Sequence, residues 1–301
     1  MALKFLSVLA LYSMMVPERC LLILISGLTT KLEVEIMFIE VSGIKINYEL
    51  SGKEKAPVVA LSHSLACSML MWAPQLKQLE SDFRVLRYDT RGHGDSDAPS
   101  EPYTLSELVD DAISLLDALA IDRVHWVGLS MGGMIGQGVA LSHSERLASL
   151  VLADTAAIIP TEAQSIWQER IDTVRREGMK AVAESTLERW FTPDYLRQNL
   201  PVVDQIRQQI FATPVMGYIG CSEAIRRLSY LDQLTAIQTP TLIMVGADDP
   251  GTPVAASEAM HARIPDSILV VIPCAAHLSN IEQAEVFNTN LMTFLNRNLH
   301  K

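Results

Sequence analysis

Cysteine is scarce in this sequence. Only four cysteines occur among 301 residues, namely Cys20, Cys67, Cys221 and Cys274. They lie far apart and form no Cys-x-x-Cys pair, so the sequence predicts neither a zinc site nor a disulfide framework. We expect reduced thiols packed as small apolar side chains.

Basic residues are also fewer than acidic ones. The chain has 24 Lys and Arg against 35 Asp and Glu, which gives a formal net charge of −11. This balance argues against nucleic-acid binding, which needs a basic face. It also means that an anionic substrate needs a local cationic patch to oppose the overall field. Because 49% of the residues are apolar and 20% are charged, the chain can bury a sizeable core.

No apolar run is long enough to span a bilayer. Near the start, Lys4 precedes the apolar run Phe5–Val16, and Leu21–Ile25 forms a second one. A small-x-small cleavage site is missing from the expected place, so the likeness to a signal peptide is poor. We predict that residues 1–36 are an extension outside the domain, for example from an upstream start codon, and that Met37 begins the domain. The expected location is cytoplasmic, without stable membrane insertion; an export signal stays open as the alternative.

From Met37 onward, strand and helix patterns alternate. Phe38–Val41 and Ile44–Tyr48 alternate apolar and polar residues around a Ser-Gly turn, which predicts an antiparallel hairpin. Six apolar runs are typical of strands buried on both faces: Val58–Leu61, Val85–Tyr88, Val124–Leu129, Leu147–Leu152, Thr241–Val245 and Ile268–Ile272. Helical patterns lie at Leu105–Leu119, Gly132–Leu141, Ala255–Ile264 and Ile281–Leu295. This order predicts an α/β fold with a mostly parallel, doubly wound sheet.

The alternation stops between about Ala156 and Asp232. This stretch is helical in pattern and contains two tryptophans, Trp167 and Trp190, and the arginines Arg170, Arg175, Arg176, Arg189, Arg226 and Arg227. We interpret residues 156–232 as a helical cap inserted into a sheet domain made of residues 37–155 and 233–301.

The segment Gly128–Gly133 fits the pattern G-x-S-x-G, with a predicted strand before it and a predicted helix after it. Glycines let the chain turn sharply, so that Ser130 stands on a strained bend above the sheet. The backbone N–H of Met131, at the start of the helix, can then face a developing oxyanion. The sequence therefore predicts that Ser130 is a catalytic nucleophile.

A serine hydroxyl needs a base to accept its proton. Proteins with this elbow carry the triad in the chain order Ser, acid, His, which leaves His261, His277 and His300 as candidates. His300 is near the C-terminus, and His261 lies in a predicted helix. His277 lies in a loop directly after a buried strand, where doubly wound sheets present functional groups, so we predict that His277 is the base.

The orienting carboxylate is expected in the loop after the preceding strand. That loop, Gly246–Pro253, offers two aspartates, Asp248 and Asp249, and the residues alone do not separate them. Thr252 and Pro253 predict the N-cap and first position of the next helix.

A second oxyanion donor is expected in the loop after an early strand, and the N–H of Leu65 is the predicted group. His63, in the same loop, precedes Ser130 in the chain, so we expect it to hold the loop by hydrogen bonds. The segment Asp89–Asp97 clusters a histidine with acids, yet it lacks metal-ligand spacing and is interpreted as a polar loop.

These residues resemble the α/β-hydrolase superfamily, and within it the 3-oxoadipate enol-lactonases. The resemblance rests on Asp89–Gly94 and Gly128–Gly133, on Asp154–Ala157, on the cap sequence Leu187–Pro193 and on Ala276–Gln283. It runs from about Met37 to the C-terminus. Two departures are the first 36 residues, which have no counterpart, and His63, where these lactonases often carry asparagine.

The family pattern G-x-x-D-x-x-T-P falls on Gly246, Asp249, Thr252 and Pro253, so the resemblance selects Asp249 as the acid. It implies hydrolysis of a small carboxylate-bearing enol-lactone in the catabolism of aromatic compounds, without a metal or organic cofactor. We expect substrate contacts from Trp190 and Arg189. The alternatives are a general carboxylesterase, a cofactor-free perhydrolase and a ligand-binding receptor of the same fold.

Overall fold

The computed structural model describes residues 37–100 and 102–299, so the prediction made for residues 1–36 lies outside it. The described residues belong to the second of two compact units, Glu35–Lys301. Among them, no helix combines the length and the apolar composition needed to cross a membrane.

Eight strands form one sheet in the order β1-β2-β4-β3-β5-β6-β7-β8. Their bounds are β1 Met37–Val41, β2 Ile44–Gly52, β3 Val58–Ser62, β4 Arg84–Tyr88, β5 Val124–Leu129, β6 Leu147–Ala153, β7 Thr241–Gly246 and β8 Ile268–Ile272. The β1–β2 and β2–β4 pairs are antiparallel, and every other pair is parallel. The predicted hairpin and the mostly parallel sheet are confirmed.

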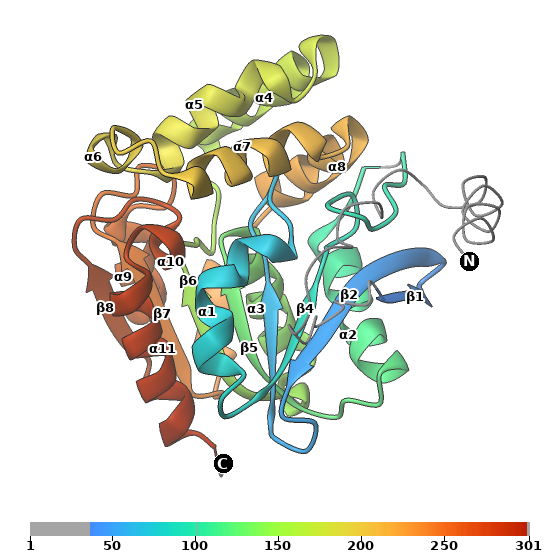
Figure 1. Cartoon of the computed structure of the whole chain (residues 1–301), viewed down its shortest axis with the longest axis vertical. Coiled ribbons are helices and arrows are strands. Elements are labelled where there is room, and N and C mark those ends of the chain that lie inside the picture. Colours follow the sequence, from blue (N-terminus) through green and yellow to red (C-terminus); the bar gives the residue numbers. More distant parts are fainter. Residues whose placement is uncertain (1–36, 101, 300–301) are drawn as a thin grey trace, which may run out of the picture. The chain divides into compact units, whose positions relative to one another are not determined.

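Helices cover both faces of this sheet. Helices α1 (Ala73–Leu79) and α11 (Ala284–Arg297) pack together in front of it, whereas α2 (Leu105–Ala118) and α3 (Met131–Ser142) lie behind it, as Figure 1 shows. A capping box formed by Thr104 and Glu107 fixes the start of α2. Helix α9 (Val254–His261) packs against β7 and β8.

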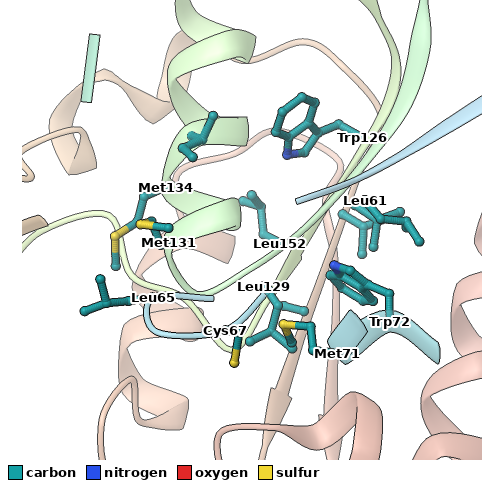
Figure 2. Close-up of a cluster of buried hydrophobic side chains, with 14 of the residues drawn as sticks. Leu61, Leu65, Cys67, Met71, Trp72, Trp126, Leu129, Met131, Met134 and Leu152 are labelled. Carbon is teal, nitrogen blue, oxygen red and sulfur yellow. The ribbon is translucent and has the colours of Figure 1, made fainter. Parts of the chain in front are cut away.

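The core fills the space between these layers. All six residues of β5 are buried, because β5 lies between β3 and β6 and is covered on both faces. Figure 2 shows part of this core, in which Trp72 and Trp126 lie near Leu61, Leu129 and Leu152. Burying one such side chain contributes about 1.5–3 kcal/mol. Leu129 and Met131 are both fully buried, so the core anchors the chain on either side of Ser130.

The prediction that β8 is buried on both faces is wrong. It is the last strand of the sheet and has only β7 beside it, so Ile268 and Val271 keep 39% and 42% of their surface exposed.

The single helix predicted over Ile281–Leu295 is also wrong, because the chain leaves helical geometry at Gln283. Short α10 (Ser279–Glu282) precedes that break and α11 follows it. Hydrogen bonds from the Gln283 side chain to the Cys274 carbonyl and from the Ala276 N–H to Glu282 tie α10 to the preceding loop instead.

Between β6 and β7 the chain is almost entirely helical. The α-helices of this stretch are α4 Gln164–Glu177, α5 Lys180–Trp190, α6 Pro193–Leu196, α7 Pro201–Ala212 and α8 Val215–Arg226. They lie together at one end of the sheet, at the top of Figure 1. Residues 156–232 are called the cap segment below; that they form a separate domain stays a prediction.

Candidate active site

Ser130 stands at the sharp turn between β5 and α3. Its backbone has φ 55° and ψ −114°, a strained conformation of a kind that costs about 1–3 kcal/mol and needs support from its surroundings. That support comes from hydrogen bonds: the Ser130 N–H donates to the Ala153 carbonyl at 2.9 Å, and Thr155 Oγ1 donates to the Ser130 carbonyl at 2.7 Å. Glycine is required at position 132, since a Cβ there would lie 2.0 Å from the Ser62 carbonyl oxygen.

His277 and Asp249 meet at the same end of the sheet. His277 Nδ1 lies 2.7 Å from Asp249 Oδ2, and both side chains are buried. Asp249 Oδ1 accepts the N–H groups of Gly251 and Thr252 at 2.7 and 3.1 Å, and Thr252 Oγ1 donates to Oδ2 at 2.6 Å. The carboxylate is therefore fixed through both oxygens.

The two groups stabilise each other in their charged forms. Burial raises the pKa of Asp249, but the charge of His277 and the hydrogen bonds from His277 and Thr252 outweigh it and hold the pKa at about 2. Burial lowers the pKa of His277, yet the charge and hydrogen bond of Asp249 raise it above its ordinary value. His277 can therefore accept a proton while Asp249 stays ionised.

Of the two aspartates that the residues alone could not separate, Asp249 is the one in contact with His277, whereas Asp248 is exposed. The predicted N-cap at Thr252 is wrong. Helix α9 begins at Val254, with Pro253 before it and no side-chain cap, because the Thr252 hydroxyl donates to Asp249 instead.

The two predicted oxyanion donors are both available. Within the described part of the chain, neither the Leu65 N–H nor the Met131 N–H has a hydrogen-bond acceptor, whereas the next residues, Ala66 and Gly132, donate to His93 Nε2 and to the His63 carbonyl. Met131 is the first residue of α3, so the positive end of the helix dipole adds to its N–H.

His63 and His93 brace the loop that carries Leu65. His63 Nε2 accepts the Thr90 N–H at 2.9 Å, and its Nδ1 donates to the Ser64 carbonyl at 2.7 Å. His93 Nε2 accepts the Ala66 N–H at 2.9 Å. Burial lowers the pKa of both histidines, that of His93 to about 3, so each is a neutral acceptor. The interpretation of His63 as a loop-holding residue agrees with these contacts.

A cavity of about 550 Å³ joins the end of the sheet to the cap segment. Ser130, His277 and Leu65 line it from the core, and the predicted substrate-binding residues Arg189 and Trp190 line it from α5. The Trp190 ring stacks beside His277 with ring centroids 6.3 Å apart. A volume of this size is typical of small-molecule sites. Among the described residues, no group of His, Cys, Asp and Glu side chains could hold a metal ion.

The arginines of the cap segment fall into two groups. Six form ion pairs with carboxylates: Arg175 with Asp172, Arg176 with Glu177, Arg197 with Asp194, Arg207 with Glu184 and Asp204, and Arg226 and Arg227 with Glu223. The other two, Arg170 and Arg189, form no ion pair with any described residue, and both line the cavity. Arg189 donates only to the Ser185 carbonyl and Thr186 Oγ1, at 2.6 and 3.1 Å, so most of its N–H groups are free.

This pair creates a local positive field in a chain of net charge −11. Burial and the nearby charge of Arg170 lower the pKa of Arg189, and Tyr218 and Glu188 only partly oppose that shift. Arg170 also packs against the ring of Trp167, 5.4 Å from its centroid.

Sequence reasoning missed Arg170 as a cavity residue, although a signal exists. Every ion-paired arginine of the cap segment has an acidic residue three or four positions earlier, as Arg175 has Asp172, whereas Arg170 and Arg189 have none. It also assigned no role to Asp154, which is buried beside Asp249 and His277.

Comparison with known proteins gives the family. Residues 57–284 match the α/β-hydrolase fold family. The 3-oxoadipate enol-lactonase 2 of Acinetobacter baylyi is 37% identical over 245 residues, which cover 81% of this chain and 91% of that protein. The crystal structure of the enol-lactonase from Burkholderia xenovorans LB400 superimposes with a TM-score of 0.84 at 37% identity, covering 86% of this chain and 100% of that one.

RutD of Yersinia enterocolitica, a candidate carbamate hydrolase, is 31% identical over 258 residues, which cover 82% of this chain and 91% of that protein. The chain belongs to the α/β-hydrolase fold family and is a hydrolase with enol-lactonase relatives.

Proposed function

We propose that this protein is a serine hydrolase that opens a small, carboxylate-bearing enol-lactone of the 3-oxoadipate enol-lactone type. The observation that carries the proposal is the cavity lined by Ser130, His277 and two arginines that have no carboxylate partner among the described residues. Such a site can hold an anion and a carbonyl group together. The enol-lactonase relatives at 36–37% identity support the same substrate class.

In the first half of the reaction, Ser130 Oγ attacks the lactone carbonyl while His277 takes its proton. Asp249 stabilises the imidazolium that forms, and the N–H groups of Leu65 and Met131 hold the oxyanion. The ring C–O bond then breaks and the enol oxygen leaves with the proton from His277. The enol rearranges to a ketone, which makes the acylation hard to reverse.

In the second half, water attacks the acyl-enzyme ester and His277 removes the proton of that water. Collapse of the second oxyanion breaks the bond to Ser130, whose Oγ recovers the proton. The product is a free acid with a ketone on the former leaving side.

Arg189 and Arg170 determine which substrates enter this chemistry. A guanidinium with free N–H groups binds a carboxylate through paired, charge-assisted hydrogen bonds. Trp190 forms the apolar wall between these charges and His277. The substrate carboxylate would supply the negative charge that the cap segment lacks at this place.

The test is a substrate panel with purified protein: the enol-lactone, p-nitrophenyl acetate as a neutral ester, and an aliphatic carbamate. We expect kcat/KM for the lactone to exceed that for the neutral ester by about 100-fold, and rising salt to weaken only the lactone reaction. Equal values for lactone and ester would favour the general carboxylesterase, and preferred carbamate cleavage would favour a RutD-like activity. Peroxide-dependent halogenation would indicate a perhydrolase. Turnover too slow for catalysis would indicate a ligand-binding receptor.

A further inference from the structure

Two consecutive residues at the end of β6 contact all three segments that carry the proposed triad. Thr155 Oγ1 donates to the Ser130 carbonyl at 2.7 Å. Asp154 Oδ1 accepts the N–H of Gly246, which begins the loop of Asp249, at 2.8 Å. Asp154 Oδ2 accepts the hydroxyl of Ser279, two residues beyond His277, at 2.5 Å.

Asp154 itself is held firmly. It is fully buried, its N–H donates to the Met244 carbonyl at 2.8 Å, and its φ of 43° lies in the left-handed region. Asp and Asn tolerate that region better than most residues. Burying a carboxyl group at a strained backbone position lowers the stability of the fold, which is typical of residues that have a functional role.

We propose that Asp154 is a positioning residue for His277: its carboxyl group joins the loops of Asp249 and His277 and, when ionised, stabilises the imidazolium that forms during catalysis. The proposal rests on the proposed function. Asp154 does not touch the reacting atoms and acts through His277.

The electrostatic environment gives the direction of the effect. Burial and the charge of Asp249 raise the pKa of Asp154 to about 8, while His277 and the hydrogen bonds from Ser279 and Gly246 oppose that rise. The charged groups that act on His277 are Asp249, Asp154 and, from the cap segment, Arg189. With a pKa of about 8, Asp154 is mostly protonated at neutral pH and gains its negative charge near His277 as the pH rises past that value.

The rate should respond with a definite sign. The transition state contains a positive imidazolium, so ionised Asp154 lowers the barrier and neutral Asp154 does not. After the rise caused by deprotonation of His277, kcat should therefore rise again through pH 8. A coupling of one pKa unit corresponds to a tenfold second rise, and we expect about that size.

The experiment measures kcat for p-nitrophenyl acetate from pH 5.5 to 10 in the wild type, Asp154→Asn and Asp248→Asn. Asparagine keeps the shape and can still accept from Gly246 and donate to Ser279. We expect the second rise of kcat in the wild type and in Asp248→Asn, which carries the same substitution at an exposed position. We expect Asp154→Asn to lack the second rise. The ratio of wild-type to Asp154→Asn kcat should therefore grow about tenfold across pH 8.

A ratio that is constant with pH, or a wild type without the second rise, would overturn the proposal, because a purely structural residue changes kcat equally at every pH. Ser279→Ala covers the case in which Asp154→Asn does not fold. It removes a hydrogen bond that lowers the pKa of Asp154, so the second rise should move to higher pH; an unmoved rise contradicts the assignment. Ser130→Ala in the same assay tests the proposed function separately: if the proposed function is wrong, this variant keeps its activity.

Discussion

The end of the sheet and the cap segment differ in whether their charged side chains have partners within the protein. At the end of the sheet, Asp249 and Asp154 each have both carboxyl oxygens bonded within the protein. In the cap segment, Arg170 and Arg189 line the cavity and pair with no carboxylate of the described chain, although the six other arginines of the segment each have one. The first arrangement is complete before any substrate arrives, and the second is completed by the substrate.

This contrast separates two contributions to an enzyme's selectivity. Preassembled groups serve any acyl substrate, because they act on the carbonyl carbon and the proton that every such substrate shares. Unpaired charges discriminate, because a ligand without the opposite charge leaves them unsatisfied. Changes at the sheet end should therefore affect all substrates alike, and changes in the cap segment should not.

The largest effect is expected from Ser130→Ala. Loss of the nucleophile should lower kcat at least about 10⁴-fold for lactone and neutral ester alike. The melting temperature should stay within a few degrees, since the hydroxyl contributes no packing to the core. Ser142→Ala, at the other end of α3, is the matched control and should keep wild-type kinetics. Activity within tenfold of the wild type would refute the nucleophile assignment.

Next in size is Asp249→Asn, for which we expect a loss of about 10³–10⁴-fold in kcat on both substrates. The amide cannot stabilise the imidazolium and favours the wrong histidine tautomer. The neighbouring exposed Asp248→Asn should change kcat by less than about twofold. Steady-state kinetics decide between them, and the reverse ranking would transfer the role to Asp248.

A selective effect is expected in the cap segment. Arg189→Ala or Arg170→Ala should lower kcat/KM for the anionic lactone about 10- to 100-fold through KM, because a charge-assisted hydrogen bond is lost. Turnover of p-nitrophenyl acetate should change less than about threefold. The control is Arg175→Ala, an ion-paired arginine on α4. If neither cavity arginine separates the two substrates, the cap segment is an apolar lid and the esterase alternative gains.

The smallest effect concerns the loss of stability between pH 7.5 and 5.0 that buried histidines of the core cause; the cap segment contains no histidine. His63 and His93 have pKa values below the unfolded value of about 6.5, so the folded state disfavours their protonation. Their contribution is complete above about pH 6.5 and is lost as pH falls below it; for His93, whose folded-state pKa is about 3, the loss approaches about 1.4 kcal/mol per pH unit.

Urea unfolding at pH 7.5 and 5.0 measures this loss. The His93→Gln variant keeps an acceptor for the Ala66 N–H and should show a smaller loss than the wild type. The partly exposed His143→Gln should match the wild type. Identical losses in His93→Gln and the wild type would show that the His93 site does not cause the acid sensitivity.

Much of the candidate site could be predicted because its sequence signals are local. The glycines around Ser130 and the loop position of His277 follow from strand and helix patterns that a short stretch of sequence determines. The strand and helix patterns alone could not separate Asp249 from Asp248, because adjacent side chains in a loop diverge; the family resemblance selected Asp249, and the structure places that residue against His277. Two features were missed because they depend on tertiary contacts: the edge position of β8 is set by the order of the strands, and the break at Gln283 by hydrogen bonds to the preceding loop.

The loop of His277 is fastened to the cap segment. Glu282 accepts the Ala276 N–H and is hydrogen-bonded to Thr192 at the start of α6, and the Leu278 N–H donates to the Trp190 carbonyl at 3.0 Å. A movement of this side of the cap segment would therefore also move the loop that carries His277. We expect substrate to enter beside Ile158 and Ile166, which line the cavity and remain 42% and 50% exposed. Substrate entry and product release at that place would leave the loop of His277 in its position.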